Sequence, residues 1–511
     1  MRKKTITIGL GLFIYLLAIQ ANAASRADVG ASIANGIAWL AGQQNSDGSW
    51  GDAEKVGCTA FAVVKLEDRA LELGMSPFDE GYVHSQKVIG GLNYLFGQAG
   101  TYGDGTGTCF GKGRHVNYNT GLVMMAIAAG RDPNRIVSVP GSIVHGWTYK
   151  QVLQANVDFF ATFQKDDGGW QYEPYDPTGF SDNSITGYVV LGLAYARESI
   201  YGFNCTILDS VKEKLNRWVD HIQVSGGDHD GGSGYGGGNT SDMLRAGNLI
   251  FEMAFLGDTR DTPRMQRALN YLGRAWNDPA WSWDDIHTYP GWYGNPAWNG
   301  EPYLPKSDWW QGLDERYGGW QGPHYQAMYC MMKGLTYAGI DTINVDGIDV
   351  NWYDAFATRI TFGQNDDGSW DRDYWGDEIL ATEWALLTLE AIAPPGPVID
   401  VSIDIKPGSL PNSINLKSEG VIPVAILTTD LLDAATVDPA SITFGLTGTE
   451  ATLLKFAMQD IDGDGDTDII LHFKTKATGI VCGTTAAYLK GRTVNEQAIQ
   501  GSDSVRTVGC K

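Results

Sequence analysis

The stretch that decides the fold is Gln44-Asn-Ser-Asp-Gly-Ser-Trp50, because it occurs three times with little change. The other two copies read Gln164-Lys-Asp-Asp-Gly-Gly-Trp170 and Gln364-Asn-Asp-Asp-Gly-Ser-Trp370. In each copy the Asp-Gly pair predicts a tight turn, since glycine can adopt the positive φ that ends a helix. The glutamine can bond loose backbone groups at the helix end, and the tryptophan can cover the hairpin. The pattern therefore predicts a recurring turn between two helices.

Apolar stretches with helical spacing flank each copy and recur, without the full turn motif, in the gaps between copies. The copies follow stretches such as 33–40 and 152–163 and precede 59–73, 184–196 and 380–392. The degenerate pairs are 88–96 with 120–129, 207–222 with 243–256, and 265–276 with 325–337. The sequence thus predicts six helical hairpins, which can close into a ring of alternating inner and outer helices over residues 30–393.

A second domain follows the linker Ala393-Pro-Pro-Gly-Pro397, where proline ends the last helix and the composition changes. With 394–398 as the linker, residues 399–511 alternate apolar and polar side chains between turns rich in Pro, Gly and Asn, which predicts a small all-β sandwich. Cys482 and Cys510 lie in this module and are the preferred disulfide pair. Cys58 with Cys109 is a weaker pairing, and Cys205 and Cys330 are expected to be free.

The β-module contains Asp460-Ile-Asp462-Gly-Asp464-Gly465-Asp466-Thr-Asp468, which predicts a calcium site. Ca²⁺ takes six to eight oxygen ligands on a flexible loop, and acids at alternate positions with a glycine at position 6 provide them. Asp460, Asp462 and Asp464 would bind through side chains, Asp466 through its carbonyl, and Asp468 directly or through water. Position 12 is Leu471 rather than an acid, so another loop must complete the shell. The alternative is a solvated acidic turn without an ion.

The first 23 residues have the features of an export signal. Three cations at positions 2–4 precede an apolar stretch, and Ala21-Asn-Ala23 follows as a small-x-small cleavage site. Cleavage after Ala23 would leave a secreted chain without a transmembrane anchor; an uncleaved anchor is the alternative. The formal charge of −23 makes nucleic acid an unsuitable partner, because such a surface repels phosphate backbones.

The three turn motifs resemble the QW-type repeats of squalene cyclases and protein prenyltransferases. This resemblance implies an (α/α)6 toroid with a central cavity over residues 30–393. Similar turns occur in the thioester domains of macroglobulins and in some polysaccharide lyases, so fold narrows function only weakly. The family's chemical signatures are missing here: Ser282-Trp-Asp-Asp285 does not fit the Asp-x-Asp-Asp acid, and no Asp-x-Cys zinc pair occurs.

Tryptophans and acids gather between residues 276 and 320. Indole faces stack on sugar rings, and nearby carboxylates can act as acid and base, so this segment provides candidate glycan contacts. The weak catalytic candidates are Asp284, Asp285 and His324. The candidate substrate-binding residues are Trp281, Trp283, Trp309 and Trp310. The alternatives are an insert that packs its own small core, and indoles that stabilise carbocations.

Polar residues also precede five of the six predicted inner helices and could ring one opening of the cavity. They are His115, Asn117, Asn119, Asp182, Asn183, Asn239, Asp242, His324, Asp377 and Glu378. The commoner role of such residues is to cap the helix that follows them.

Three function classes remain, in order of preference. The first is a secreted protein that binds, and in one version cleaves, an extracellular polymeric ligand such as a glycan. The second is a non-catalytic cell-surface scaffold, and the third is a terpenoid cyclase or prenyltransferase-like enzyme. A carboxylate pair facing across an open cavity would favour the first class, and a sealed aromatic cavity with one buried acid would favour the cyclase. A ring filled by side chains would favour the scaffold.

Overall fold

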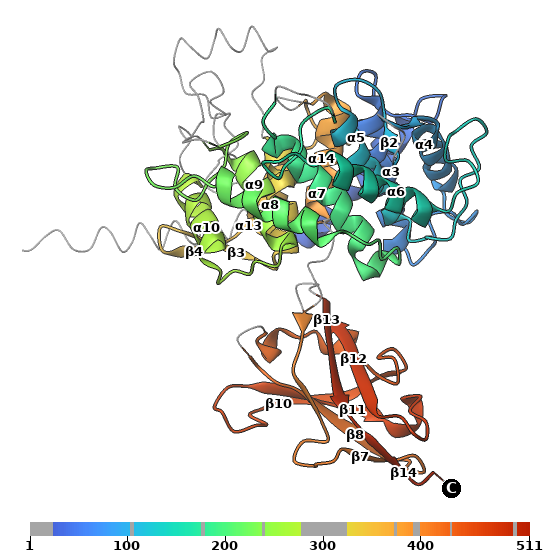
Figure 1. The fold of residues 1–511 in the computed structure, drawn as a ribbon, viewed down its shortest axis with the longest axis vertical. Helices are drawn as coiled ribbons and strands as arrows, with labels where there is room; N and C mark the ends of the chain where they lie inside the picture. Colours follow the sequence, from blue (N-terminus) through green and yellow to red (C-terminus); the bar gives the residue numbers. More distant parts are fainter. Residues whose placement is uncertain are drawn as a thin grey trace, which may run out of the picture. The chain divides into compact units, whose positions relative to one another are not determined.

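The computed structural model describes residues 24–102, 107–174, 179–237, 241–276, 324–372, 376–391, 399–429, 432–493 and 498–510. The predicted signal peptide and linker lie outside these residues. The chain divides into two compact units, residues 1–394 and 395–511 (Figure 1). The first is helical and the second is built from strands.

Six helices form the inner ring of the helical unit. They are α3 (Lys55–Glu72), α5 (Val116–Ala129), α7 (Asn183–Arg197), α9 (Met243–Phe255), α12 (Tyr325–Tyr337) and α14 (Glu378–Leu389). Each contacts the next in this order, and α14 contacts α3, so the ring is closed. Inner helices such as α5 and α9 are buried on nearly every side.

Six further helices lie outside this ring, and each immediately precedes an inner helix among the described helices. They are α2 (Arg26–Gly42), α4 (Ser85–Gly97), α6 (Tyr149–Phe163), α8 (Asp209–Ile222), α10 (Pro263–Ala275) and α13 (Trp352–Phe362). Their pattern is that of surface helices: α8, for example, buries a stripe that contains Val211, Leu215 and Trp218. The unit is therefore a helical toroid of six hairpins, as the turn motif predicts.

The three turn motifs share one hydrogen-bond arrangement. Each tryptophan is fully buried, and its indole N–H donates to a carbonyl ten residues earlier, in the preceding outer helix, at 2.7 to 3.0 Å. Each glutamine amide donates to a glycine carbonyl within its own turn and to a carbonyl of another outer helix. For Gln44 and Gln164 that carbonyl belongs to Lys87 of α4 and Val211 of α8, the next outer helices along the chain.

The third glutamine closes the ring. Gln364 donates to Gly368 O at 2.9 Å and to Ser32 O of α2, the first outer helix, at 2.8 Å. The turn between α8 and α9 lacks the full motif, but its glutamine makes the same two kinds of hydrogen bond. Gln223 donates to Gly231 O in its own turn at 3.2 Å and to Arg264 O of α10 at 2.8 Å. The glutamine therefore links successive hairpins, besides satisfying its own helix end.

Short elements interrupt the helical pattern. They are the strands β1 (Ala99–Gly100), β2 (Cys109–Phe110), β3 (Thr342–Val345) and β4 (Ile348–Asn351), and the 3₁₀ turn η1 (Ser199–Tyr201). The β3–β4 hairpin turns at Asp346 and Gly347, both with positive φ, and leads directly into α13. None of the described helices is long and apolar enough to cross a membrane.

The second unit contains ten strands and three 3₁₀ turns within its described residues. The strands are β5 (Ile399–Asp400), β6 (Ile403–Ile405), β7 (Ser413–Asn415), β8 (Val421–Ile426), β9 (Thr443–Gly445), β10 (Ala451–Gln459), β11 (Asp468–Lys474), β12 (Ala486–Arg492), β13 (Ala498–Ser504) and β14 (Arg506–Val508). The turns are η2 (Ala434–Thr436), η3 (Pro439–Ser441) and η4 (Thr475–Ala477).

Eight of these strands form one sheet in the order β5-β13-β12-β9-β10-β11-β8-β6, rather than the two facing sheets of the predicted sandwich. The segment 399–405 causes the difference. Its first residues pair with β13, and its last residues pair with β8 at the other side of the sheet. The Ile405 amide also donates to Asp503 Oδ2 of β13 at 2.9 Å, so the sheet curls until its two ends nearly meet. Side chains such as Ile405, Val424 and Phe473 fill the interior.

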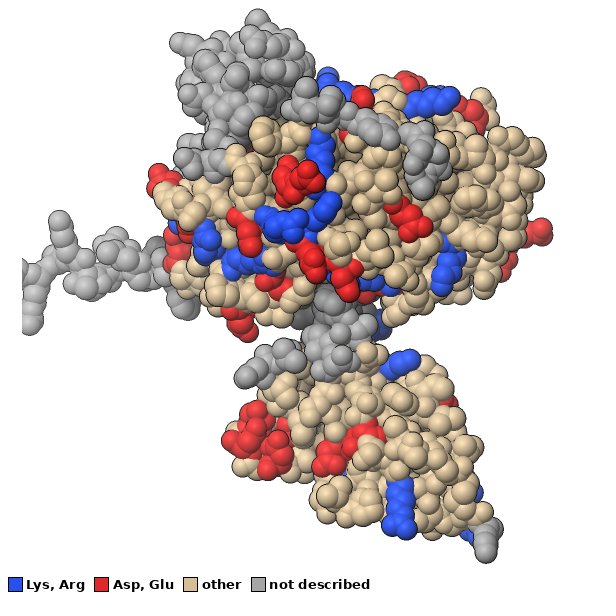
Figure 2. All heavy atoms as spheres, in the orientation of Figure 1, with Lys and Arg blue, Asp and Glu red and all other residues tan. Residues whose placement is uncertain are grey.

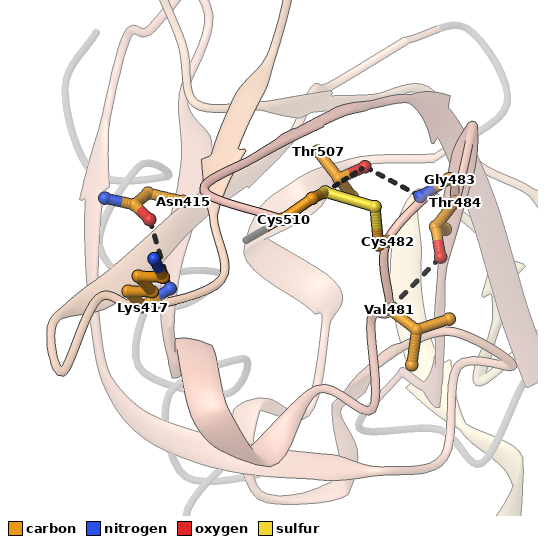
Figure 3. The surroundings of a disulfide bond; sticks show 8 residues. All are labelled: Asn415, Lys417, Val481, Cys482, Gly483, Thr484, Thr507 and Cys510. Atoms are coloured by element: carbon orange, nitrogen blue, oxygen red, sulfur yellow. Dashed lines mark hydrogen bonds between the residues drawn. A yellow bond between two sulfur atoms is a disulfide. The ribbon is translucent and has the colours of Figure 1, made fainter.

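The cysteines follow the preferred pairing. Cys482 and Cys510 form a disulfide with Cα atoms 5.6 Å apart (Figure 3). Beside it, the Gly483 amide donates to Thr507 Oγ1 at 3.0 Å, which ties the same two segments together. Cys58 and Cys109 are both free and buried, so the weaker predicted pairing is wrong; Cys205 and Cys330 are free, as expected.

Candidate functional site

All six inner helices begin on one side of the ring, which we call the mouth. A cavity of about 190 Å³ lies there and is lined by the N-cap residue or first turns of every inner helix. Two loop residues, Tyr172 before α7 and Tyr235 before α9, complete the wall. The remaining lining residues are Glu54, Gly57, His115, Tyr118, Ser184, Ile185, Tyr188, Leu244, Arg245, Gln326, Leu380 and Trp384.

Aromatic rings make up much of the wall. Tyr118, Tyr172, Tyr188, Tyr235 and Trp384 all face the cavity, and the rings of Tyr118 and Tyr188 are 4.4 Å apart. Because π faces attract apolar groups and cations alike, such a wall suits a ligand with an apolar or cationic body.

The centre of the ring beyond the cavity is filled. The buried Lys333 of α12 lies with Nζ 4.4 Å from the ring centroid of Tyr188 and donates to Gly187 O at 3.3 Å. Burial lowers the pKa of this amine. Phe61 and Tyr329 pack edge to face beside it, with ring centroids 5.5 Å apart. These side chains close the inner end of the cavity, which therefore does not continue through the toroid as a channel.

An acid and a histidine form the first polar group of the wall. His115 Nδ1 lies 3.1 Å from Glu54 Oε2, and the imidazole lies 5.4 Å from the ring of Tyr172. The hydrogen bond from His115 lowers the pKa of Glu54, so this carboxylate is ionised and accepts the Nδ1 hydrogen. In the neutral imidazole this leaves Nε2 as the hydrogen acceptor, which is the arrangement of a general base.

An ion pair forms the second polar group, on α9, three places from α3 in the ring of six. Arg245 Nη1 contacts Asp242 Oδ2 at 3.0 Å, and both side chains are almost fully buried. The guanidinium also lies 3.6 Å from the ring centroid of Tyr235. These contacts hold Arg245 rigidly, so it can present a fixed positive charge to a bound molecule.

Several polar residues predicted to ring the mouth are helix caps. Asp182, Asp242 and Asp377 accept hydrogen bonds from amides in the first turns of α7, α9 and α14. Burial raises the pKa of Asp182, whose Oδ1 also accepts from the hydroxyl of the wall residue Ser184 at 2.6 Å. His324, a catalytic candidate, is buried at the start of α12, where Nδ1 accepts from the Ala327 amide at 3.4 Å. It caps the helix and is not among the residues that line the cavity.

The other candidates in the tryptophan-rich segment, Asp284, Asp285, Trp281, Trp283, Trp309 and Trp310, lie outside the described residues. The prediction did not include Glu54, Tyr172 or Tyr235. The position of two of these residues in the sequence could have identified them, because Glu54 and Tyr172 both lie between the tryptophan of a turn motif and the inner helix that follows it.

The acidic loop of the second unit joins β10 to β11. The carboxylates of Asp460, Asp462 and Asp464 are exposed, and one oxygen of each lies within 4.8 Å of the others. Local desolvation and the neighbouring carboxylates, Asp464 first, raise the pKa of Asp466 to about 6. Asp468 is fully buried, and its two oxygens accept from the amides of Thr428 and Ile461, each at 2.8 Å. Asp468 thus anchors the loop to the segment that follows strand β8.

Comparison with known proteins gives structural matches alone. No family model matches the chain, and no curated protein matches it. Among solved structures, the type II terpene cyclase MstE from Scytonema, in its apo form, is 14% identical with a TM-score of 0.38, covering 71% of this chain and 97% of that one. A variant of that enzyme in complex with its substrate, geranylgeranyl dihydroxybenzoate, is 13% identical with a TM-score of 0.39 and the same coverage. A similarity at this level identifies neither a family nor an activity for the chain.

Proposed function

We propose that the helical unit binds a small, largely apolar molecule in the cavity at its mouth, as a cyclase- or transferase-like enzyme would. The observation that carries this proposal is the wall of five aromatic side chains around a space closed by a floor. At about 190 Å³ the space is smaller than the roughly 300–1,000 Å³ of typical ligand pockets, which suits a compact ligand or one end of a longer one.

A polymeric glycan fits this site less well. A glycan-cleaving enzyme generally needs two carboxylates on either side of the bond that breaks. Among the described lining residues Glu54 is the one carboxylate, and its lowered pKa disfavours the role of acid. The first function class therefore stays a prediction that rests on the tryptophan-rich segment outside the described residues.

The dyad of Glu54 and His115 adds a chemical element to the proposal. A carboxylate that fixes the imidazole with Nε2 as acceptor supports removal of a proton from a bound molecule. A cyclase that starts by protonating its substrate needs an acid instead. Asp182, with its raised pKa and its hydrogen bond to Ser184, is the described carboxyl best placed beside the wall to hold that proton.

The test compares two kinds of ligand on the mature protein. Farnesol and geranylgeraniol serve as apolar ligands and a xylan hexasaccharide as the glycan, with binding measured by calorimetry. Protection of His115 from diethyl pyrocarbonate, read by mass spectrometry, locates the ligand; the exposed His145 is the internal control. We expect an apolar alcohol to bind and to protect His115 but not His145.

A cavity-filling variant makes the test specific. A Cβ at Gly57 would meet its nearest neighbours at 3.5 to 3.8 Å, which is ordinary contact, so Gly57→Leu fills the cavity from α3 with little strain at its base. Gly97→Leu is the matched control, because a Cβ there meets nothing within 4 Å. Loss of binding in Gly57→Leu alone supports the proposal. Binding of the hexasaccharide and of neither alcohol would replace it with the glycan function, and binding of neither class would favour the scaffold.

We also propose that the loop 460–468 binds Ca²⁺. Support comes from the alternate acids with a glycine at position 6 and from the three clustered carboxylates. Asp468 is fully buried and accepts two amide hydrogens, so its part is to hold the loop, whereas the exposed carboxylates of Asp460, Asp462 and Asp464 are left for direct coordination. Thermal unfolding in calcium and in chelator tests this: calcium should raise the Tm of the wild type and much less that of Asp462→Asn. The exposed Glu419→Gln is the control, and an equal shift in all three proteins would contradict the proposal.

We infer further that the protein is exported. The N-terminal signal pattern predicts it, and the Cys482–Cys510 disulfide is of a kind that persists in oxidising compartments. Sequencing of the N-terminus of the protein recovered outside the cytoplasm should begin at Ala24. Accumulation of the uncleaved chain in membranes would support the anchor instead.

A further inference from the structure

One edge of the strand β10 has no described neighbour. Residues 453–459 pair with β11 on one side, whereas β9 covers the other side at Ala451 and Thr452 alone. The strands β10 and β11 thus form a hairpin whose outer edge, residues 453–459, is open in the described part of the chain (Figure 1). An open edge presents unpaired backbone N–H and C=O groups that another strand can bond.

The same edge carries exposed apolar side chains. Leu454, Phe456 and Met458 are 49%, 51% and 40% exposed. Phe456 and Met458 stand opposite Leu471 and Ile469 of β11, which are fully buried. Directly opposite residues of an antiparallel pair share one face, so Phe456 and Met458 lie on the core-facing side of the sheet at a place where no described residue covers them. Single exposed apolar residues are ordinary, but three on one free edge mark an interaction surface.

We propose that this edge pairs with the same edge of a second copy of the chain, antiparallel and with Phe456 opposite its own counterpart. The free segment 453–459 has residue 456 at its centre, so a two-fold axis through Phe456 uses the whole free edge and avoids the residues that β9 already covers. In this arrangement Phe456 meets its own counterpart, and Leu454, which lies at the register irregularity between Leu453 and Lys455, comes next to Met458 of the second copy. Such a self-complementary contact is the kind that closes a two-fold dimer.

Charge selects this register and direction. Two neighbouring antiparallel registers would keep the same side chains on the same face. One of them places the apolar Leu454 opposite the charged Asp460, and the other places Lys455 opposite the same lysine of the second copy, so both are less favourable. Parallel pairing would set the two acidic loops side by side, whereas antiparallel pairing keeps them at opposite ends of the strand pair. The space-filling view shows the acidic side chains gathered at the end of this hairpin, which makes their separation necessary (Figure 2).

The contact is small, so the dimer should be weak and reversible. Three half-exposed apolar side chains bring on the order of 300 Å² per copy, compared with roughly 800 Å² per partner in a standard stable interface. Main-chain hydrogen bonds along the edge add to this. We therefore expect a dimer whose population depends on protein concentration.

A cysteine placed on the two-fold axis tests the register. In Phe456→Cys the two new thiols would face each other across the strand pair at a distance that a disulfide can span. The four free native cysteines are all buried and will not compete. Leu410→Cys is the control, because Leu410 lies in the same unit and is 93% exposed, so chance encounters favour it. We expect Phe456→Cys to form the intermolecular disulfide about tenfold faster than Leu410→Cys, because pairing raises the effective thiol concentration.

Sedimentation velocity of the full mature chain gives an independent measurement. The wild type should show a concentration-dependent dimer that Phe456→Lys weakens about tenfold, since burying a lysine at the axis places two cations together. Circular dichroism checks that the variant is folded. The proposal fails if the wild type is monomeric at all concentrations, if Phe456→Cys cross-links no faster than Leu410→Cys, or if folded Phe456→Lys dimerises as the wild type does.

Discussion

Replacing Gln364 by alanine removes the side chain that joins the last hairpin of the ring to the first. The Gln364 amide donates to Ser32 O on α2 at 2.8 Å and to Gly368 O in its own turn at 2.9 Å. α2 and α13 also contact each other directly, so the bond to Ser32 is one part of the closure. Comparing the variant with the wild type measures how much the Gln364 amide contributes to holding α2 against the last hairpin.

The magnitude follows from the two hydrogen bonds. Each contributes about 1 kcal/mol net, and carbonyls left without a partner cost more than the bond itself was worth, so we expect a loss of about 2–3 kcal/mol. That loss corresponds to roughly 30- to 150-fold faster opening of the region, since each 1.4 kcal/mol is a factor of ten. Native-state hydrogen exchange measures it on the amides of the turn, such as Gly368, and on those of α2.

The two other turns are matched controls. Gln44→Ala and Gln164→Ala remove equivalent bonds, but their second acceptors belong to α4 and α8 rather than α2. All three variants should speed exchange at their own turn, whereas Gln364→Ala alone should speed it in α2. If α2 exchanges as in the wild type when Gln364 is replaced, or equally fast in Gln164→Ala, the reasoning on ring closure is wrong.

Three further predictions concern packing, ionisation and the disulfide. Gly121→Ala should destabilise the helical unit by about 3 kcal/mol, because the new Cβ would lie 2.2 Å from Tyr188 O where α5 meets α7; Gly97→Ala, with open space at its Cβ, should change stability by less than about 1 kcal/mol in chemical denaturation. Burial raises the pKa of Glu383 well above its usual value, so the protonated carboxyl contributes to the stability of the folded state below the unfolded pKa, and this contribution is lost as the pH rises through the folded pKa. The variant Glu383→Gln cannot ionise and should therefore become more stable relative to the wild type between pH 4.5 and pH 8. A difference in Tm between the two proteins that does not change with pH would contradict this. Replacing Cys482 and Cys510 together by serine opens a link between residues 28 apart and should lower the stability of the second unit by about 3.5 kcal/mol, with the reduced wild type behaving like the variant.

The helical hairpins could be predicted because their signals are local. The Asp-Gly turn, the glutamine and the tryptophan lie within seven residues of sequence, and the apolar spacing on either side defines the helices. Another local signal was present and went unused: Asp346-Gly347 between alternating apolar residues is typical of a two-residue hairpin turn, and the structure has β3 and β4 there. Where the residues that make a turn lie together in the sequence, the turn can be predicted even though some of its hydrogen bonds reach other helices.

The parts that could not be predicted depend on distant pairings. The curled sheet of the second unit forms because 399–405 pairs with both β13 and β8, about 100 and 20 residues away, and nothing in the alternation of these strands specifies that choice. The cavity wall likewise draws on six helix starts and two loops spread over more than 300 residues of sequence. Glu54 is a candidate because its carboxylate contacts His115, which lies 61 positions away in the sequence, and the sequence alone does not reveal that contact.

The two ends of the helical ring differ in a way that fits the position of the cavity at the mouth. At the far end, contacts between buried side chains join the ends of the inner helices: Lys65 forms an ion pair with Glu390, and Tyr337 donates to Glu198 Oε1 at 2.8 Å. At the mouth, three of the six inner helices are capped by their own aspartates, which leaves the space between them free. The connections that enter the mouth also differ in length and composition from one hairpin to the next, whereas the turn glutamines repeat. Because loops on a rigid scaffold can change without disturbing its core, we expect the loop residues Tyr172 and Tyr235 to tune the specificity of the proposed ligand site, whose remaining wall is formed by the helix starts.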